Sequence, residues 1–543
     1  MIKRSCFIIF WMVSASVLAE NAAQKENCVV SQHETFTADN VVITPQNIFD
    51  EEAENAIALH HWANSLHIVT KPFVIEERLV FQQGDEVSLG DLAEAEAILR
   101  REIYIANAQV EATNLCDATK PNTVTVTTQD NWSLVPTFSF GRSGGENSSL
   151  IGVRDSNLLG LGVYAQFRYT SDEQRSGYQL GFASAFHWIP HANVQLNLAD
   201  NDDGERFHFI FNKPFYHVGT QTMQYAEVFN FRRVEDIFQN GETRNSLDVE
   251  QTLFRGAYGW NISASENHAR RIVVGVDFSD TVFAFDPSSP SFNPLFLPED
   301  REYQFPWVAY EFLDRNIKVK QDIRLIKQPE DINFGWLYRL QFGLETNDTR
   351  EGSDFGYHLS ASAERAFEMN DWLFLFETDF RTILNTTAKD FVRMSSRIDA
   401  FYRYSNVIGY YARFSGDFSS GQFLDIPIAL DDDSGVRGYP NQYQHGAHRV
   451  SASVETRFYT NYNVYQLFEV GFAGFFDVGR AFNGETAQFN EDDGVLSSVG
   501  IGARFYSNKA SSPGVVHLDI TKPLTDGDGV DSLEWSVQFR RSF

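Results

Sequence analysis

The chain has 543 residues, a formal net charge of −29 and a mean hydropathy of −0.30. This acidic surplus excludes nucleic-acid binding, which requires a basic surface. Aromatic residues make up 14% of the chain, with 48 Phe and 21 Tyr. Large apolar residues diluted evenly by polar ones are typical of strands with one lipid-facing and one wet face. A transmembrane antiparallel β-barrel is therefore favoured over an array of soluble β-sandwiches.

The first 19 residues predict a cleavable secretory signal. Lys3 and Arg4 precede an apolar stretch from Cys6 to Leu18, which ends at Ala19. Loss of these two cations would take the net charge from −29 to −31. No later segment approaches the ~18 consecutive apolar residues that a spanning helix needs. The exported chain is expected either to be soluble or to cross a membrane as strands.

Two cysteines, Cys28 and Cys116, remain once Cys6 leaves with the signal. In an oxidising compartment we expect them to form a disulfide, and the alternative is two unpaired thiols. No histidine lies at ligand spacing from them, so we expect neither a metal site nor a cofactor.

Residues 20–65 predict a polar, irregular lead that contains one helix over Glu51–Leu66. Residues 66–129 predict a compact α/β unit. Its first strand is expected at His67–Thr70, and its second helix at the capping box Ser88–Asp91. Strands at Ala106–Thr113 and Thr123–Thr128 complete a β-α-α-β-β order.

From residue 130 to the C-terminus, turns divide the chain into short alternating segments that predict the barrel. In Leu533–Phe543, the residues on one face are Trp535, Val537, Phe539 and Phe543, and those on the other are Glu534, Ser536, Gln538 and Arg540. A strand with its share of long outer loops takes roughly 25 residues, which predicts about 16 strands.

Two other patterns indicate ordinary loops. Gly141–Gly145 matches G-x-S-x-G, but a hydrolase elbow needs a helix next, and a second strand follows here. Asp526–Asp531 hints at calcium but lacks the ligand order of an EF-hand. With no catalytic constellation above chance, we do not expect an enzyme.

Three motifs in the barrel region carry more specific information. They are Asp155–Gly162 (DSNLLGLG), Val436-Arg437-Gly438-Tyr439, and Phe475-Phe476-Asp477-Val478-Gly479. In this order, and with a C-terminal Phe, the set resembles the BamA/TamA superfamily of outer-membrane assembly and secretion barrels. The unit at 66–129 likewise is similar to that family's POTRA (polypeptide-transport-associated) domain.

The alternation of the strand around 468–479 places Asp477 toward the lumen. A buried carboxylate needs a cation or water, and the resemblance implies that Arg437, on a loop folded into the lumen, supplies the cation. Gly438 would let the backbone pass close and Tyr439 would pack flat. Phe475 and Gly479 complete the wall side of this lumen-loop lock. The alternative is a surface turn near an unrelated strand end.

The resemblance implies a protein of the Gram-negative outer membrane whose N-terminal domain lies in the periplasm. That domain would capture unfolded or secreted polypeptides, or lipid, by strand addition. The barrel would pass them outward or between its first strand, near Trp132–Phe140, and its last. Ser536, Gln538 and Arg540 are expected to contribute little to that seam.

Partners would be the outer-membrane lipids, and the general barrel-assembly machinery for the protein's own insertion. The chain is expected to have one POTRA-like unit, whereas better-known members of the family have more. It also lacks the appended hydrolase domain of some members. Both departures leave the identity of the client open. The second hypothesis is a passive channel or structural barrel, plugged by the same loop.

Overall fold

The computed structural model describes residues 35–49, 61, 64–115, 119–186, 188–285, 293–347, 349–464, 468–507 and 514–540. The predicted signal peptide, Cys28, Cys116 and Phe543 lie outside the described residues. Within them, no helix is both long and apolar enough to cross a bilayer.

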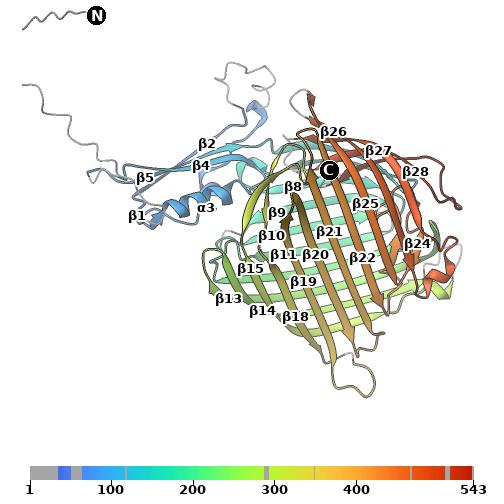
Figure 1. Ribbon diagram of the computed structural model, residues 1–543. Coiled ribbons are helices and arrows are strands. Elements are labelled where there is room, and N and C mark those ends of the chain that lie inside the picture. The colour runs from blue at the N-terminus through green and yellow to red at the C-terminus, as the bar shows by residue number, and fades with distance from the viewer. Residues whose placement is uncertain are drawn as a thin grey trace, which may run out of the picture.

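The main body is one closed antiparallel barrel, whose described strands number 20 (Figure 1). In ring order they are β6 (Leu134–Ser143), β7 (Glu146–Asp155), β8 (Tyr164–Ser171), β9 (Ser176–Ala185), β10 (Asn193–Asn201), β11 (Gly204–Lys213), β12 (Thr222–Gln239), β13 (Glu242–Ala264), β14 (His268–Phe285), β15 (Arg301–Asp314), β18 (Leu337–Glu345), β19 (Gly356–Met369), β20 (Trp372–Leu384), β21 (Phe391–Arg403), β22 (Ile408–Ser420), β25 (His448–Val464), β26 (Phe468–Phe482), β27 (Leu496–Ser507), β28 (Val515–Pro523) and β29 (Glu534–Arg540). Short 3₁₀ turns lie at η1 (Leu158–Gly160), η2 (Pro294–Phe296) and η3 (Thr486–Phe489).

The expectation of about 16 strands is therefore too low. It allowed every strand a share of long outer loops. Several connections are instead tight turns, such as Gly144–Gly145 between β6 and β7 and Asn370–Asp371 between β19 and β20, all with positive φ. The predicted hairpin at Gly141–Gly145 is confirmed by the pairing of β6 with β7.

The wall alternates as a lipid-embedded barrel requires. On β28, Leu518 and Ile520 are exposed outside, whereas His517 and Asp519 are buried inside. The outer face is apolar and aromatic in every sector, as at Phe138, Phe167, Phe207, Phe254, Val308, Leu340, Phe380, Phe414, Phe472 and Trp535. This surface matches hydrocarbon, so the barrel has the form of a membrane-spanning one.

The two ends of the barrel differ in what they carry. The chain enters β6 directly from the N-terminal domain, which lies beside the upper end in Figure 1. We call this the domain end. Because the number of strands is even, β29 finishes there too. The long connection between β22 and β25, residues 421–447, starts and ends at the opposite end. We call it the lumen loop.

The N-terminal domain contains a three-stranded sheet in the order β2 (Asn40–Gln46), β5 (Thr123–Asp130), β4 (Ile105–Thr113). β2 runs parallel to β5, and β4 runs antiparallel to it. β1 (Thr35–Thr37) pairs separately with β3 (Glu86–Ser88). The expected strand at His67–Thr70 is wrong, since that segment is unpaired and β2 lies in the part expected to be irregular. Thr and Pro interrupt the apolar run of β2, which weakened its signal.

Two described helices cover this sheet, α2 (Pro72–Glu76) and α3 (Leu89–Leu99), and Asn64–Leu66 are also helical. The predicted capping box is confirmed. The Ser88 amide donates to the Asp91 carboxylate at 2.8 Å, and the Asp91 amide donates to Ser88 Oγ at 3.2 Å. Leu92, Ala95 and Leu99 are buried in the domain core, as the spacing predicts.

The DSNLLGLG turn between β7 and β8 fastens this domain to the barrel. Asn157 Nδ2 donates to Thr70 Oγ1 at 2.8 Å, and Thr70 in turn donates to the buried Asp130. The Lys71 amide donates to the Gly160 carbonyl at 2.8 Å. Gly160 has φ +72°, and a Cβ there would lie 2.5 Å from the Val69 carbonyl oxygen. Only glycine allows this approach.

We expect Asn157→Ala to loosen this junction by about 1–3 kcal/mol, because it strips a hydrogen bond from buried polar groups. Limited proteolysis of the 130–134 connection measures the effect, and cleavage should accelerate. Asn406→Ala, in an exposed turn at the same end, is the matched control. Equal cleavage of both variants would show that the turn does not hold the domain.

Candidate functional site: the lumen loop and the barrel seam

The lumen loop folds back into the barrel instead of projecting from it. Its short strands β23 (Ile428–Leu430) and β24 (Gln444–Gly446) pair with each other and are fully buried. Between them, Val436, Tyr439 and Tyr443 pack with Ala481 and Leu496 of the barrel region. The loop therefore has a small core of its own against the wall at β26 and β27.

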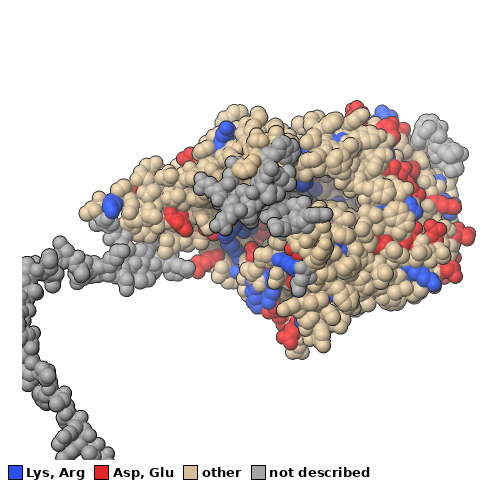
Figure 2. Space-filling view, turned by 90° about the horizontal axis from the view of Figure 1, so that it is seen from above, with Lys and Arg blue, Asp and Glu red and all other residues tan. Residues whose placement is uncertain are grey.

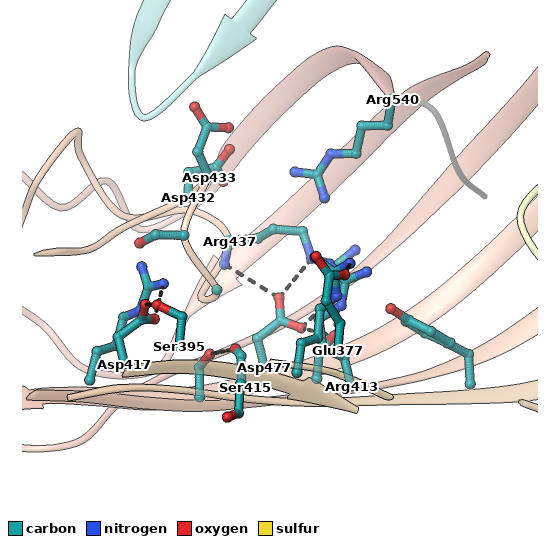
Figure 3. Close-up of a pocket in the computed structure, with 18 of the residues that line it drawn as sticks. Glu377, Ser395, Arg413, Ser415, Asp417, Asp432, Asp433, Arg437, Asp477 and Arg540 are labelled. Atoms are coloured by element: carbon teal, nitrogen blue, oxygen red, sulfur yellow. Dashed lines mark hydrogen bonds and ion pairs between the residues drawn. The ribbon is translucent and has the colours of Figure 1, made fainter. Parts of the chain in front are cut away.

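Arg437 is the polar centre of this loop (Figure 3). Its Nε lies 2.7 Å from Asp477 Oδ2 and its Nη2 lies 2.8 Å from Oδ1, a bidentate pair with β26. The guanidinium carbon lies 3.4 Å from the centroid of the Phe475 ring, so the cation also stacks on the same strand. Arg437 and Asp477 are both almost completely buried.

Further charged residues complete a buried cluster around this pair. Arg437 Nη1 lies 3.1 Å from Glu455 on β25 and 3.8 Å from Asp519 on β28. Arg457 Nε lies 3.0 Å from Glu455, and Arg504 binds Asp519. Three guanidinium groups thus face three carboxylates, so the cluster is neutral as a whole. Burial alone would lower the pKa of Arg437, but Asp477 and Glu455 outweigh it and raise that pKa.

The residues beside Arg437 are fitted to the wall. Gly438 has φ +88°, and a Cβ there would lie 2.9 Å from Thr521 on β28. Tyr439 is buried, and its hydroxyl donates to the Ser497 carbonyl at 2.8 Å. At Gly479, a Cβ would lie 3.1 Å from Leu430 of the loop. Side chains at either glycine would push the loop away from the strands.

A second junction joins the lumen loop to the seam where β29 meets β6. One carboxylate oxygen of buried Asp432 accepts from the Gly438 amide at 2.6 Å. The other accepts from Ser143 Oγ of β6 at 2.6 Å and from Gln538 Nε2 of β29 at 2.7 Å. Gln538 also donates to Ser143 at 2.8 Å, so the expectation that it contributes little to the seam is wrong.

The backbone contributes little to that seam. β28 and β29 pair continuously from Val515–Arg540 to Thr521–Glu534, whereas β29 and β6 share one pair, Val537–Arg142, among the residues that the structure describes. Side chains supplement it. Arg142 Nε lies 3.0 Å from Glu534, and the Phe140 and Trp535 rings stack at 6.2 Å. Trp535, Val537 and Phe539 face outward, as the alternation predicts.

The structure brings together all six sequence-predicted residues of the loop and β26. Sequence reasoning missed the partners Glu455, Asp519, Arg457, Arg504 and Asp432. The first four lie on inward-facing positions of their strands, so strand parity was a usable signal. Asp432 lies in an acidic run within a loop, and side-chain periodicity does not predict the geometry of a loop.

Below the loop lies a polar cavity of about 370 Å³. Its lining mixes carboxylates, guanidinium groups and hydroxyls, among them Glu377, Ser395, Arg413 and Asp417. Most of these charges are already paired, as Asp417 is with Arg449 and Arg393. Among the described residues, no group of three or more His, Cys, Asp or Glu is placed to hold a metal ion. The arrangement suits holding the loop against the barrel wall.

We expect Arg437→Ala to destabilise the seated loop by about 3–5 kcal/mol, since it leaves buried carboxylates without their cation. Protease resistance of the loop and heat-modifiability of the barrel measure this. Arg480→Ala, an exposed change on the same strand as Asp477, is the control and should resemble wild type. If Arg437→Ala keeps full loop resistance, the pair does not hold the loop.

Acid should also release the loop, through His445. Burial lowers the pKa of His445 to about 4, against an ordinary value near 6.5. Between these values the released loop binds a proton that the seated loop does not, so stability falls as pH falls. The loss is on the order of 3 kcal/mol at pH 4 and vanishes above about pH 6.5.

Hydrogen exchange of residues 428–446 across this pH range tests the effect. His445→Gln should flatten the dependence, and exposed His268→Gln should leave it unchanged. An equally steep dependence in His445→Gln would assign the transition to other groups.

Comparison with known proteins gives likenesses of structure only. No protein-family model and no curated protein sequence matches this chain. Among solved structures it is similar to BamA from Haemophilus ducreyi lacking POTRA domains 1–3, at TM-score 0.42 and 13% identity, over 92% of this chain and 84% of that one. CdiB from Acinetobacter baumannii matches at TM-score 0.46 and 10% identity, over 93% and 73%.

The FrpB iron transporter from Neisseria meningitidis matches at TM-score 0.41 and 8% identity, over 80% of this chain and 86% of that one. A barrel named as an iron transporter thus scores nearly as high as BamA. All these TM-scores are below 0.5, so the likenesses assign no function to this chain.

Proposed function

We propose that this protein is an outer-membrane barrel that inserts or exports polypeptides, with its N-terminal domain in the periplasm. The single observation that carries the proposal is the seam, where one described backbone pair closes a barrel whose other neighbouring strands each share at least seven pairs. In lipid, unpaired backbone groups cost free energy. Two strands that share few backbone hydrogen bonds therefore need a further partner for their free amides and carbonyls. A client strand supplies that partner.

The lumen loop supports the same proposal. Asp432 binds both the Arg437–Gly438 turn and the two seam strands, so the loop and the seam share one carboxylate. Displacing the loop would remove that carboxylate from Ser143 and Gln538. We infer that release of the loop from the Arg437 cluster loosens the seam.

The N-terminal domain offers a place for clients to dock. Its sheet ends at β2 and β4, and no further described strand pairs with their outer edges. On β4, the Val110 amide donates to Glu96 of α3 at 3.2 Å. A POTRA-like domain would add an extended client segment to such an edge, with backbone hydrogen bonds providing affinity independent of sequence. Attachment through Asn157 and Gly160 would deliver the segment to the domain end of the barrel.

The passive-channel alternative predicts a different electrical behaviour. A pore would give steady large currents in wild type. The buried lumen loop favours low conductance instead.

A reversible crosslink across the seam tests the proposal. Arg142→Cys with Val537→Cys places two thiols at the one paired position, and oxidation should stop client insertion or export until reduction restores it. Val516→Cys with Phe539→Cys, a pair within the continuous β28–β29 ladder, is the matched control. Equal transport with the seam oxidised and reduced would refute passage through it.

The client is identified by in-cell photocrosslinking from Glu111 on the exposed face of β4, with Gln83 in an exposed turn as control. Polypeptide captured at Glu111 but not at Gln83 is the expected result. Capture of lipid alone, or of nothing above the control, would contradict a polypeptide client.

A further inference from the structure

One hairpin at the domain end is much longer than the neighbouring connections. Residues 315–336 join β15 to β18 and form the strands β16 (Ile317–Gln321) and β17 (Pro329–Asn333). We call this segment the crossing hairpin and residues 322–327 its tip. Other described connections at this end are shorter, from two residues at Asn370–Asp371 to eight between β11 and β12.

The tip reaches across the lumen. Ile323 packs with Leu373, Phe401 and Tyr411 on β20, β21 and β22. Ile326 is fully buried in a cluster with Tyr459, Ala473, Tyr506 and Val515, on β25, β26, β27 and β28. β28 lies eight positions around the ring of 20 strands from β18, where the hairpin ends. The tip therefore meets the wall almost opposite its own base.

Polar contacts hold the tip in place. Asp322 lies 2.9 Å from Arg403 on β21, and Lys327 lies 3.1 Å from Glu469 on β26. Glu330 of β17 accepts from two tip amides, that of Arg324 at 2.8 Å and that of Leu325 at 3.0 Å. The tip is thus a preformed knob with one apolar face and charged flanks, not a slack connection.

The tip and the lumen loop converge on one ion pair although they enter from opposite ends. Arg457 Nη1 donates to the Ile323 carbonyl at 3.1 Å, and its Nε lies 3.0 Å from Glu455. Glu455 in turn lies 3.1 Å from Arg437 Nη1 of the lumen loop. Glu455 and Arg457 are alternate residues on the inner face of β25. Movement of either segment removes a partner from this pair.

We propose that the crossing hairpin is an autoinhibitory gate at the domain end, and that Glu455 and Arg457 couple it to the lumen loop. Both ends of the lumen are closed through one buried pair, so displacing either segment also weakens the hold on the other. In Figure 2, which is seen from above, blue side chains lie together with red ones where the narrow N-terminal domain meets the barrel. The hairpin carries five cations, Arg315, Lys318, Lys320, Arg324 and Lys327, against three acids, Asp322, Glu330 and Asp331, and Lys318 and Lys320 both bind Glu368. Its net charge is therefore positive. An acidic stretch of an incoming polypeptide is the partner whose charge fits.

Ile326→Asp tests the gate, because a carboxylate cannot stay in that apolar cluster. In the purified full chain we expect trypsin to cut after Arg324 and Lys327, and bilayer conductance to rise at least threefold. Val319→Asp, an exposed change on the same hairpin, is the control and should resemble wild type. Unchanged cleavage and conductance in folded Ile326→Asp would overturn the gate. If that variant does not fold, Ile326→Ala should give the same changes at smaller size.

Coupling is tested by hydrogen exchange of residues 436–439 in Ile326→Asp and in Arg457→Gln. Both should speed exchange of the lumen loop several-fold, although Ile326 does not touch it. If Arg457 only stabilises the barrel, Ile326→Asp should leave hydrogen exchange of the lumen loop unchanged. That result would overturn the coupling.

The gate rests on the proposed function only in naming a polypeptide as the partner. Conductance, cleavage and exchange use the purified barrel without any client. Failure of the seam crosslink to block transport would therefore leave these results standing, and the reverse also holds.

Discussion

In hydrocarbon every backbone amide and carbonyl must find a partner within the protein, and the rest of this structure follows from that constraint. It forces the strands into a closed ring. The more backbone pairs two neighbouring strands share, the more firmly the ring is closed between them. Every other ladder of the described ring has at least seven residue pairs. At the seam between β29 and β6, side chains supplement the one described backbone pair, through Arg142–Glu534 and through Ser143, Gln538 and Asp432.

The lumen shows how a strongly acidic chain manages buried charge. Single unpaired ions would be expensive there, so carboxylates and guanidinium groups are grouped until they balance. The Arg437 cluster joins four strands and a loop, and Arg457 extends it to the crossing hairpin. Such a network is stable when complete and costly when one member is lost. That property suits segments that must be held firmly and released together.

The alternation of inward- and outward-facing side chains along each strand accounts for most of what could be predicted from the sequence. It placed Asp477 and Phe475 inside and Trp535 and Phe539 outside, and it applies equally to Glu455 and Asp519. The number of strands could not be obtained this way, because turn lengths are set by local backbone geometry. The crossing hairpin was also hidden, since the alternation of Ile317, Lys318 and Val319 reads like any wall strand. At β2, Thr44 and Pro45 masked a strand whose partners on β5 lie 83 positions further along the chain.

Hydrogen exchange of the barrel amides in detergent or lipid tests the central claim most directly. The account predicts that amides of β6 and β29 facing the seam exchange well before those of β25 and β26, and sooner still in Asp432→Ala. Uniform protection around the ring, unchanged by loss of Asp432, would contradict it.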